Sequence, residues 1–211
     1  MKEEIILLGG GGHCKSCIDV IEQEDRFSIA GILDMPENLG QKIAGYSFIG
    51  TDDDIEKLSK QFKYFFITVG HIQSPAIRIK LFHRLCELKV NIPVIVSPHA
   101  VVSKNTELGR GTIIMHQAIV NTEARVGENC IINTGALIEH ESTVGSNCHV
   151  STYAILNGQC ILGNESFIGS HTVLANNISV AASTLVAAGS VVLRSLENSG
   201  TYIGSPLRKI K

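Results

Sequence analysis

The feature that most constrains the fold of this chain is a six-residue repeat that runs through residues 96–192 without a break. Every sixth position in this stretch is a branched aliphatic residue, as at Ile132 and Ile138, and two residues before most of them stands a small one, as at Cys130 and Ala136. An α-helix repeats every 3.6 residues and a strand every two, so neither explains the pattern. A solenoid of very short strands joined by turns does explain it, with both columns facing the interior.

Three such hexapeptides make one triangular coil of about 18 residues, and residues one coil apart then stack at the ~4.8 Å spacing of hydrogen-bonded strands. The run resembles the left-handed β-helix of hexapeptide-repeat acyltransferases. The left-handed sense is implied by that resemblance alone, because connections between parallel strands are usually right-handed. Cys130, Cys148 and Cys160 fall in the small inward column, where a thiol packs like a compact apolar side chain.

The repeat fills only the second half of the 211 residues, so we predict two domains, at residues 1–92 and 93–211. In the first half, short apolar runs alternate with amphipathic stretches, which predicts a Rossmann-like domain with a small parallel sheet and ligand-binding loops at the carboxyl ends of its strands. The expected strands lie at residues 4–8, 27–33 and 64–69, and the expected helices at residues 13–24 and 74–89. The second helix is expected to turn Ile77, Leu81, Leu85 and Leu88 inward.

The composition narrows the classes of partner. The formal net charge is −2 and Lys and Arg form no run, which argues against a nucleic-acid or anionic-membrane surface and favours a small-molecule partner. No apolar run approaches the ~20 residues of a membrane-spanning helix, so we expect a cytoplasmic protein without membrane insertion. Cys14 and Cys17 beside His13 have a zinc-like spacing, but no second Cys or His pair matches it, so no metal is expected.

Four consecutive glycines, residues 9–12, separate the first predicted strand from the first predicted helix. Such a turn allows backbone N–H groups and a helix N-terminus to approach an anionic group, because glycine has no side chain to clash. As a dinucleotide fingerprint the turn is incomplete, since Cys14 stands where the third glycine is expected. A phosphate site and a tight turn without a ligand are both open interpretations.

Asp34 ends the second predicted strand, roughly where doubly wound folds place an acid that contacts the ribose or base. A solvated loop carboxylate or a helix cap is the alternative. Thr51 and the three aspartates after it are interpreted as structural, because they form a helix N-cap with carboxylates in the first turn.

In the predicted β-helix the informative residues are bulky polar ones that the repeat does not require, and Glu139-His140-Glu141 is the clearest case. The tripeptide follows the inward Ile138 and occupies a turn, so at least one of its side chains points away from the coil. A carboxylate beside an imidazole raises its basicity and fixes its tautomer, as a general base requires. An ordinary charged turn is the alternative. His149 lies half a coil away, so the two histidines would meet only across subunits.

Together, the glycine turn, Asp34, the hexapeptide run and the Glu139-His140-Glu141 turn make the whole chain resemble the sugar O-acyltransferase family related to sialic-acid O-acetyltransferases. Within it, the likeness is to PglD-like and GDP-perosamine-type N-acetyltransferases of nucleotide-linked amino sugars. The resemblance implies that His140 is the catalytic base and that Glu141 supports it. It also implies that acetyl-CoA is contacted by His149, Ser170 and Ala188, and that the nucleotide sugar is held by Gly11, Gly12, His13, Asp34, Gly70 and Asn133.

Two departures from the family pattern are visible. Met35 stands where a UDP-sugar enzyme of the family carries a second acid after the strand-end Asp, which leaves the nucleotide base open. Residues 202–206 resemble the Gly-x-Pro-Ala tail that lies near the coenzyme, with Ser205 in place of a small apolar residue. Of the other histidines in the repeat, His116 and His171 are interpreted as turn or interface residues.

The function implied by the resemblance is transfer of an acetyl group from acetyl-CoA to the 4-amino group of a nucleotide-linked amino-dideoxy sugar, in bacterial surface-glycan biosynthesis. A homotrimer with active sites between neighbouring β-helices is expected. One alternative keeps the scaffold but acetylates a sugar hydroxyl, as in sialic-acid O-acetylation. Another is a non-enzymatic β-helix protein that binds a nucleotide sugar, in which the tripeptide around His140 is only a turn.

Overall fold

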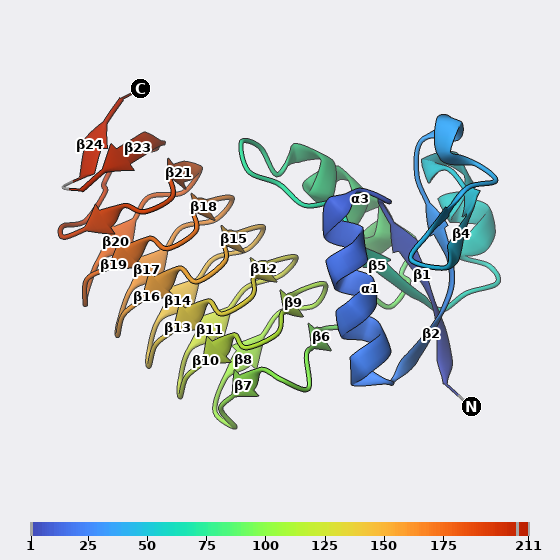
Figure 1. Ribbon diagram of the computed structural model, residues 1–211, viewed down its shortest axis with the longest axis horizontal. Helices are drawn as coiled ribbons and strands as arrows, with labels where there is room; N and C mark the ends of the chain where they lie inside the picture. Colours follow the sequence, from blue (N-terminus) through green and yellow to red (C-terminus); the bar gives the residue numbers. More distant parts are fainter. Residues whose placement is uncertain (1, 206, 211) are drawn as a thin grey trace.

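The computed structural model describes residues 2–205 and 207–210, and it places an α/β domain at one end of a long β-helix (Figure 1). The chain leaves the α/β domain after its last helix and enters the first strand of the β-helix at residue 95. This architecture confirms the predicted fold class, while the domain boundary between residues 92 and 93 stays a prediction. No helix within the described ranges is both long enough and apolar enough to cross a membrane.

The sheet of the α/β domain has five strands in the order β3-β4-β2-β1-β5. Their bounds are β1 Glu3–Leu8, β2 Phe27–Leu33, β3 Lys42–Ile43, β4 Tyr46–Gly50 and β5 Tyr64–Ile67. The pairs β1-β2, β1-β5 and β2-β4 are parallel, but β3 is antiparallel to β4. The prediction of a purely parallel sheet is therefore wrong at this edge. The chain between β2 and β4 forms a short 3₁₀ turn, η1 Pro36–Asn38, and a tight β3-β4 hairpin instead of a crossover helix.

The helices cover the two faces of this sheet. They are α1 Gly12–Glu24, α2 Ile55–Leu58, which follows the 3₁₀ turn η2 Asp52–Asp54, and α3 Ala76–Glu87. Helix α3 packs on one face through Leu81 and Leu85, whereas α1 packs on the other. Helix α1 also rests on the β-helix, where Ile113 and Ile131 are fully buried in the same cluster as Ile18. It therefore lies between the sheet and the β-helix (Figure 1).

Helix α3 departs from its predicted orientation in its first turn. Leu81 and Leu85 are buried and Leu88 is half-buried, as predicted, but Ile77 is 65% exposed, so its prediction is wrong. The helix begins at residue 76 rather than 74, which leaves Ile77 in the first turn, at the mouth of a cleft. Arg78 is the residue that is buried there instead.

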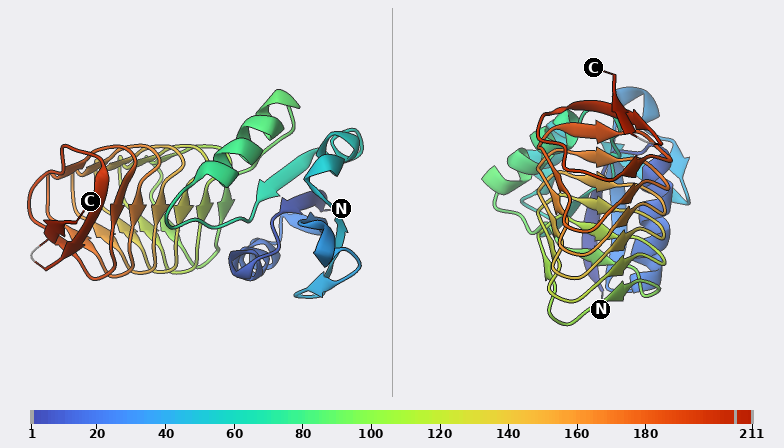
Figure 2. Two further views of the ribbon diagram at one scale, coloured as in Figure 1. Left: turned by 90° about the horizontal axis from the view of Figure 1, so that it is seen from above. Right: turned by 90° about the vertical axis from the view of Figure 1, so that its left-hand side faces the viewer.

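The β-helix consists of three sheets of parallel strands around one interior (Figure 2). The sheet that faces α1 contains β6 Ile95–Val96, β9 Ile113–Ile114, β12 Ile131–Ile132, β15 His149–Val150, β18 Phe167–Ile168 and β21 Thr184–Val186, and continues into β23 Gly200–Gly204 and β24 Leu207–Lys209. The second contains β7 Val101–Val102, β10 Ile119–Val120, β13 Leu137–Ile138, β16 Ile155–Leu156, β19 Val173–Leu174 and β22 Val191–Val192. The third contains β8 Glu107–Leu108, β11 Arg125–Val126, β14 Thr143–Val144, β17 Ile161–Leu162 and β20 Ser179–Val180.

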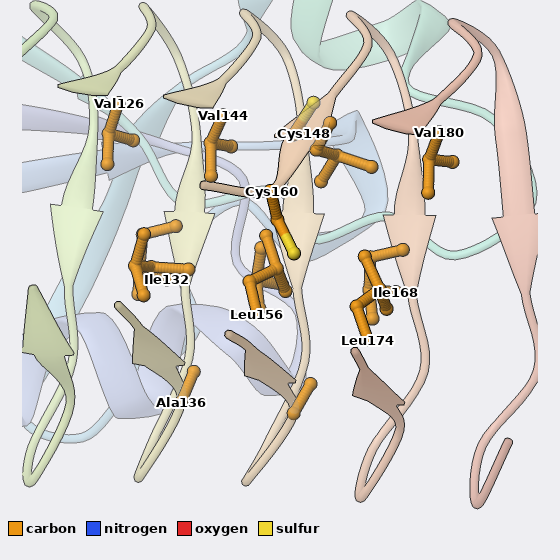
Figure 3. Packing of buried hydrophobic residues seen from close by; sticks show 14 of the residues in the cluster. Val126, Ile132, Ala136, Val144, Cys148, Leu156, Cys160, Ile168, Leu174 and Val180 are labelled. Carbon is orange, nitrogen blue, oxygen red and sulfur yellow. The ribbon is translucent and has the colours of Figure 1, made fainter. Parts of the chain in front are cut away.

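The interior of the β-helix is filled by the two columns that the repeat predicts. The second residue of each short strand points inward, and strands one coil apart are in register, as in the pairing of Val120 with Ile138. The small column is equally buried: Ala136, Cys148 and Cys160 have no exposed surface. Figure 3 shows these side chains meeting in one continuous core. The prediction that both columns face inward is therefore confirmed.

From residue 111 onward, each corner of the coil is made by a residue in the left-handed backbone region. The residues at every sixth position from 111 to 189 have φ between 54° and 73°, and only three of these fourteen are glycines. This conformation is costly for residues with a side chain, so the stacked strands must hold it in place. Glu141 occupies one such corner, with φ of 59°, and the coil therefore fixes the turn that carries His140.

The three outer faces of the β-helix differ in what covers them. The first is partly covered by α1. The third is mainly polar and carries an ion pair between Arg125 and Glu107. The second carries an aliphatic residue at every outward position, and we call it the apolar face; its outward residues are Val101, Ile119, Leu137, Ile155, Val173 and Val191. Val101 is 60% exposed and Ile119 38% exposed, so this face is uncovered in the single chain.

Candidate functional site

A cleft of about 610 Å³ lies at the carboxyl ends of β1, β2, β4 and β5. Loops from all four strands line it, because the carboxyl ends of parallel strands meet at one edge of a sheet. The cleft brings together five residues that were predicted to hold a nucleotide sugar, namely Gly11, Gly12, His13, Asp34 and Gly70. The structure thus assembles this part of the predicted site within one chain.

The four glycines of the loop divide into two pairs. A side chain on Gly9 would lie 2.4 Å from Val69, and one on Gly10 would lie 2.2 Å from the ring of Phe48. A Cβ atom on Gly11 or Gly12 would meet nothing within 4 Å among the described residues. The first pair is therefore required for packing, whereas the second pair leaves open space at the beginning of α1.

Asp34 braces the glycine loop from the end of β2. Its Oδ2 atom accepts hydrogen bonds from the backbone N–H of Gly10 and from Nδ2 of Asn38, both at 3.0 Å. At the end of β4, the predicted N-cap is confirmed, because the side chain of Asp54 accepts the backbone N–H of Thr51 at 2.9 Å in a capping box. The remaining aspartates of that turn, Asp52 and Asp53, line the cleft.

Next to the cleft, three histidines meet where the α/β domain contacts the β-helix, and we call His13, His71 and His149 the histidine joint. The ring centroid of His149 lies 5.4 Å from that of His71 and 6.4 Å from that of His13. Its Nδ1–H donates to the carbonyl oxygen of His71 at 2.7 Å, and its Nε2 accepts from Nδ2 of Asn133 at 3.1 Å. Both ring nitrogens of His149 are therefore occupied within the chain.

Arg78 lies beside the histidine joint and is only 1% exposed. Its guanidinium donates to the carbonyl oxygens of Ile67 and Val69, at 3.0 and 2.6 Å, and to the carbonyl and Oδ1 oxygens of Asn129, at 3.2 and 2.7 Å. Arg78 thereby ties the end of β5 to a corner of the β-helix. The burial of Arg78 is not predictable from the sequence, because an arginine in an amphipathic helix normally faces solvent.

The histidine joint is neutral at physiological pH. Burial lowers the pKa of His13 and His71 to about 3 and that of His149 to about 4, and the nearby charge of Arg78 acts in the same direction. Burial also lowers the pKa of Arg78, to about 10, which leaves it positively charged. The joint therefore combines one buried cation with three uncharged imidazoles.

His140 lies in the opposite kind of environment, on the exposed turn after β13. Its Nδ1 atom is 3.1 Å from Oε2 of Glu141, which also accepts from Nε2 of Gln159 at 3.2 Å. Glu139 instead accepts the backbone N–H of His140 at 3.1 Å and Nδ2 of Asn121 at 3.0 Å. Of the two acids in the motif, Glu141 is thus the partner of the imidazole and Glu139 braces the turn.

Gly158, one coil beyond His140, determines where the imidazole can lie. A Cβ atom on Gly158 would be 2.5 Å from Nε2 and 2.6 Å from Cε1 of His140. The ring therefore lies against Gly158 of the next coil, in space that only glycine leaves free. The sequence carries a signal for this contact, because Gly158 lies 18 residues, or one coil, after His140.

The residues predicted to contact acetyl-CoA lie along one edge of the β-helix. Ser170 and Ala188 follow β18 and β21, where the sheet facing α1 meets the apolar face. Asn133, which was predicted to hold the nucleotide sugar, follows β12 at the same edge. The hydroxyls of Ser170 and Ser151 are 3.0 Å apart, and Ala188 is exposed. His140 stands at the other edge of the apolar face. A single chain therefore does not bring this strip and His140 together.

The carboxyl-terminal tail is described only in part. Tyr202 is buried, and its hydroxyl donates to the carbonyl oxygen of Asn198 at 2.8 Å. Pro206, which completes the predicted Gly-x-Pro-Ala-like tail, lies outside the described residues. Of the two histidines interpreted as turn or interface residues, His171 stands at a coil corner and stacks on Tyr153 with ring centroids 5.5 Å apart.

The other one, His116, belongs to a second polar group between the domains, which we call the Asp19 latch. Nδ1 of His116 is 2.6 Å from Oγ of Ser97, and Nε2 is 2.7 Å from Oδ2 of Asp19 on α1. The order Ser-His-Asp resembles a hydrolase triad. Ser97 is only 2% exposed and does not line the cleft, so we interpret the group as a structural link between α1 and the β-helix.

Part of this chain is similar to a described protein family. Residues 4–85 match the family described as the PglD N-terminal domain. The match lies within the α/β part of the chain. Its range covers β1 through most of α3 and all the loops that line the cleft. A comparison with curated proteins finds no match.

Solved structures share the fold over the full chain. The chain is 28% identical to PerB from Caulobacter crescentus, solved with CoA and GDP-perosamine, with a TM-score of 0.92 over 99% of this chain and 97% of that one. It is 25% identical to the acetyltransferase domain of PglB from Neisseria gonorrhoeae FA1090, solved with acetyl coenzyme A, with a TM-score of 0.89 over 100% of both chains. WeeI from Acinetobacter baumannii AYE, at 19% identity and a TM-score of 0.87 over 99% of this chain and 100% of that one, shares the fold. The predicted resemblance to PglD-like and GDP-perosamine-type proteins is confirmed.

Proposed function

We propose that this protein transfers an acetyl group from acetyl-CoA to the 4-amino group of a nucleotide-linked amino-dideoxy sugar. The observation that carries the proposal is the exposed His140–Glu141 pair, in which Nδ1 of the imidazole faces a carboxylate at 3.1 Å. That contact favours the tautomer with its proton on Nδ1 and a free lone pair on Nε2. The likeness to PerB, solved with CoA and GDP-perosamine, and to the PglB domain, solved with acetyl coenzyme A, supports the class of coenzyme A-dependent sugar acyltransferases.

The proposed reaction is a direct transfer without an acyl-enzyme. The sugar amine attacks the thioester carbonyl carbon, and Nε2 of His140 takes a proton from the amine as the new C–N bond forms. The C–S bond then breaks, and the coenzyme A thiolate leaves and takes up that proton. Glu141 stabilises the imidazolium that exists between these two proton transfers.

The cleft of the α/β domain is the proposed nucleotide-sugar site. The N–H groups at the start of α1 would contact the diphosphate, because the positive end of the helix dipole and the open space at Gly11 and Gly12 both favour an anion there. Asp34 would contact the ribose with the carboxylate oxygen that does not bind the glycine loop. His13, Gly70 and Asn133 would line the path of the sugar toward the β-helix.

The coenzyme is proposed to lie along the edge that carries Ser170 and Ala188. His149 would form the wall at the end of this strip through its ring surface, since both of its nitrogens are already hydrogen-bonded. No metal is part of the proposed reaction, because the leaving thiolate and the base account for its proton transfers.

The active unit is proposed to be a homotrimer. The apolar face has the coenzyme strip at one edge and His140 at the other, and its outward aliphatic residues are uncovered in the single chain. In a cyclic assembly one edge of a subunit meets the other edge of its neighbour. Such a trimer would bring His140 of one subunit to the coenzyme of the next. Light scattering that gave a fully active monomer at micromolar concentration would rule this arrangement out.

The experiment that tests the function is a thiol-release assay with acetyl-CoA and a panel of UDP-, GDP- and dTDP-linked 4-amino sugars. Release should require the 4-amino group, and replacing that amine by a hydroxyl should abolish it. Equal release with the hydroxyl sugar would identify an O-acetyltransferase instead. Tight binding without release from any acceptor would identify a non-enzymatic nucleotide-sugar-binding protein. We place the reaction in the bacterial cytoplasm, in surface-glycan biosynthesis.

The glycine loop provides a matched test of the nucleotide site. Gly12→Val should raise KM for the nucleotide sugar at least about tenfold and leave KM for acetyl-CoA unchanged, because the new side chain would occupy the ligand's space. Gly10→Val should instead lower the yield of folded protein, since its side chain would clash with Phe48. A normal sugar KM in folded Gly12→Val would remove the diphosphate from this loop.

A further inference from the structure

The cleft crosses the carboxyl ends of four neighbouring strands in the order β5, β1, β2 and β4. Gly70 follows β5, the glycine loop follows β1, Asp34 follows β2, and Thr51 follows β4. Neighbouring strands are about 4.8 Å apart, so the β1 and β4 ends are about 10 Å apart. A ribose separates the diphosphate of a nucleotide from its base by a comparable length. With the diphosphate at β1 and the ribose at β2, the base reaches the end of β4.

The end of β4 offers carboxylates, and the cleft around it offers apolar surface from the loop after β2 and from α3. Met35 and Ile77 line the cleft and are 60% and 65% exposed, which gives the flat face of a base two apolar surfaces to contact. The polar side chains that η2 contributes to the cleft are Asp52 and Asp53, because Asp54 caps the backbone N–H of Thr51. An ionised carboxylate accepts hydrogen bonds and donates none.

Asp52 is the first residue of η2 and follows the end of β4 most closely of the two carboxylates. Asp52 lines the same cleft as Asp34. Burial raises the pKa of Asp52, whereas the charges of Arg84 and Lys80 lower it. Arg84 and Lys80 on α3 offset the negative charge that Asp52 adds to the cleft, where an anionic ligand is proposed to bind.

We propose that the cleft selects a guanosine diphosphate sugar and that the Asp52 carboxylate accepts the N1–H and N2–H groups of guanine; this inference rests on the proposed function. Guanine presents two adjacent N–H donors on one edge, which match the two oxygens of a carboxylate. Uracil and thymine present one N–H between two carbonyl oxygens. Adenine and cytosine present an amino group beside an unprotonated ring nitrogen. In each of these bases, one carboxylate oxygen would face another acceptor, so guanine alone satisfies both oxygens.

Calorimetric titration of the full chain with free nucleoside diphosphates tests this selection without the transfer reaction. GDP should bind at least about tenfold more tightly than UDP, dTDP or ADP, because each wrong base leaves a charged acceptor unpaired. Inosine diphosphate lacks only the N2 amino group and should bind at least about threefold more weakly than GDP.

Asp52→Asn supplies the matched variant. It should lower the affinity for GDP at least about tenfold and change the affinity for UDP less than about twofold. It should also abolish the difference in affinity between GDP and inosine diphosphate. Glu56→Gln removes the same charge from the neighbouring turn, where the Glu56 side chain is 67% exposed outside the cleft, and should change none of these affinities.

Two results would overturn the guanine assignment: equal affinity of the unmodified protein for GDP and inosine diphosphate, or tighter binding of any other nucleoside diphosphate. Failure of the proposed function would be a separate result. The thiol-release assay would then give no product with any amino sugar, but the order of nucleotide affinities would still identify the preferred base. Transfer to a UDP- or dTDP-linked sugar with no transfer to its GDP-linked counterpart would leave the proposed function intact and refute guanine selection.

Discussion

His140 and His149 lie nine residues apart on the same β-helix, in surroundings of opposite kinds. The side chain of His140 is 48% exposed and faces the carboxylate of Glu141. His149 is only 7% exposed, faces a carbonyl and an amide instead, and shares its surroundings with Arg78. The difference follows from position in the coil, because His140 stands at a turn and His149 stands in a strand under the α/β domain.

This comparison teaches what each environment can do with an imidazole. A proton acceptor needs solvent or substrate access and a partner that stabilises its cationic form, which only the turn provides. The histidine joint has a cation beside it and a pKa far below neutrality at each ring, so it cannot hold a proton at pH 7. We therefore assign proton transfer to the exposed histidine and domain attachment to the buried ones.

The largest expected effect is on the exposed histidine. His140→Ala should lower kcat about 100-fold or more while leaving acetyl-CoA binding and melting temperature unchanged, because a positioned base contributes on the order of 10²–10⁴-fold. Glu141→Gln should have a milder effect. His83→Ala, at an exposed histidine of α3, is the control and should keep full activity. More than about a tenth of the normal turnover in His140→Ala would contradict its assignment as the base.

Most of the fold was predictable because the repeat is a local signal. Each hexapeptide specifies one inward aliphatic, one small residue and one corner, and stacking repeats the choice on every coil. The amino-terminal strands and α1 were also predictable, because each is a short apolar or amphipathic run. The β3-β4 hairpin was missed, since its two strands contribute only one buried apolar residue apart from the half-buried Ile43 and Tyr46.

The site was predictable only where single residues carry the chemistry. His140, Asp34 and the glycine loop stand out in the sequence, and the structure places them at an exposed turn and in a cleft. Three other residues of the site do not stand out in the sequence. His71 and Arg78 act through contacts between the α/β domain and the β-helix, which the repeat does not predict. Gly158 acts through a contact with His140 on the neighbouring coil. The burial of Arg78 depends on the approach of α3 to Asn129, which lies 51 residues further along the chain.

A large effect on stability is expected from the buried side of the comparison. Arg78→Leu should lower the free energy of unfolding by about 3–5 kcal/mol, because it leaves the carbonyl oxygens of Ile67, Val69 and Asn129 buried without a donor. Arg78→Lys keeps the charge but loses the planar guanidinium. Its free energy of unfolding should lie between those of the unmodified protein and Arg78→Leu. Urea unfolding measures both variants. A loss below about 1 kcal/mol for Arg78→Leu would show that the joint does not depend on this cation.

The histidine joint also predicts a pH dependence of stability. The folded pKa values of about 3 to 4 lie below the ordinary value of 6.5, so below pH 6.5 the unfolded chain binds protons that the folded chain does not. Stability should therefore be complete above pH 6.5 and fall as the pH drops toward 4, by about 1.4 kcal/mol per pH unit for each such histidine. His71→Leu should reduce this slope by about one third. An unchanged slope between pH 6 and 5 in that variant would contradict the buried, neutral state of His71.

A smaller effect is expected from the surface on which His140 rests. Gly158→Ala should lower kcat about tenfold with both KM values unchanged, because the added methyl group forces the imidazole away from its present position. In a His140→Ala background the same substitution should cost no further activity, since there is no ring to displace. An additive loss in the double variant would mean that Gly158 acts on catalysis by another route.

The smallest effect is expected at the Asp19 latch. The environment of His116 is intermediate between those of His140 and His149, because His116 has a carboxylate partner and a side chain that is 21% exposed. The hydrogen bond from His116 lowers the pKa of Asp19, so its contribution to stability is present above the ordinary carboxyl pKa and is lost as the pH falls through the lowered folded value. Asp19 is 58% exposed, and solvent screens the interaction. Asp19→Asn should therefore lower the free energy of unfolding at pH 7.5 by only about 0.2–1 kcal/mol and leave kcat unchanged. A loss as large as that of Arg78→Leu would mean that the exposed latch holds the α/β domain against the β-helix as strongly as the buried cation does.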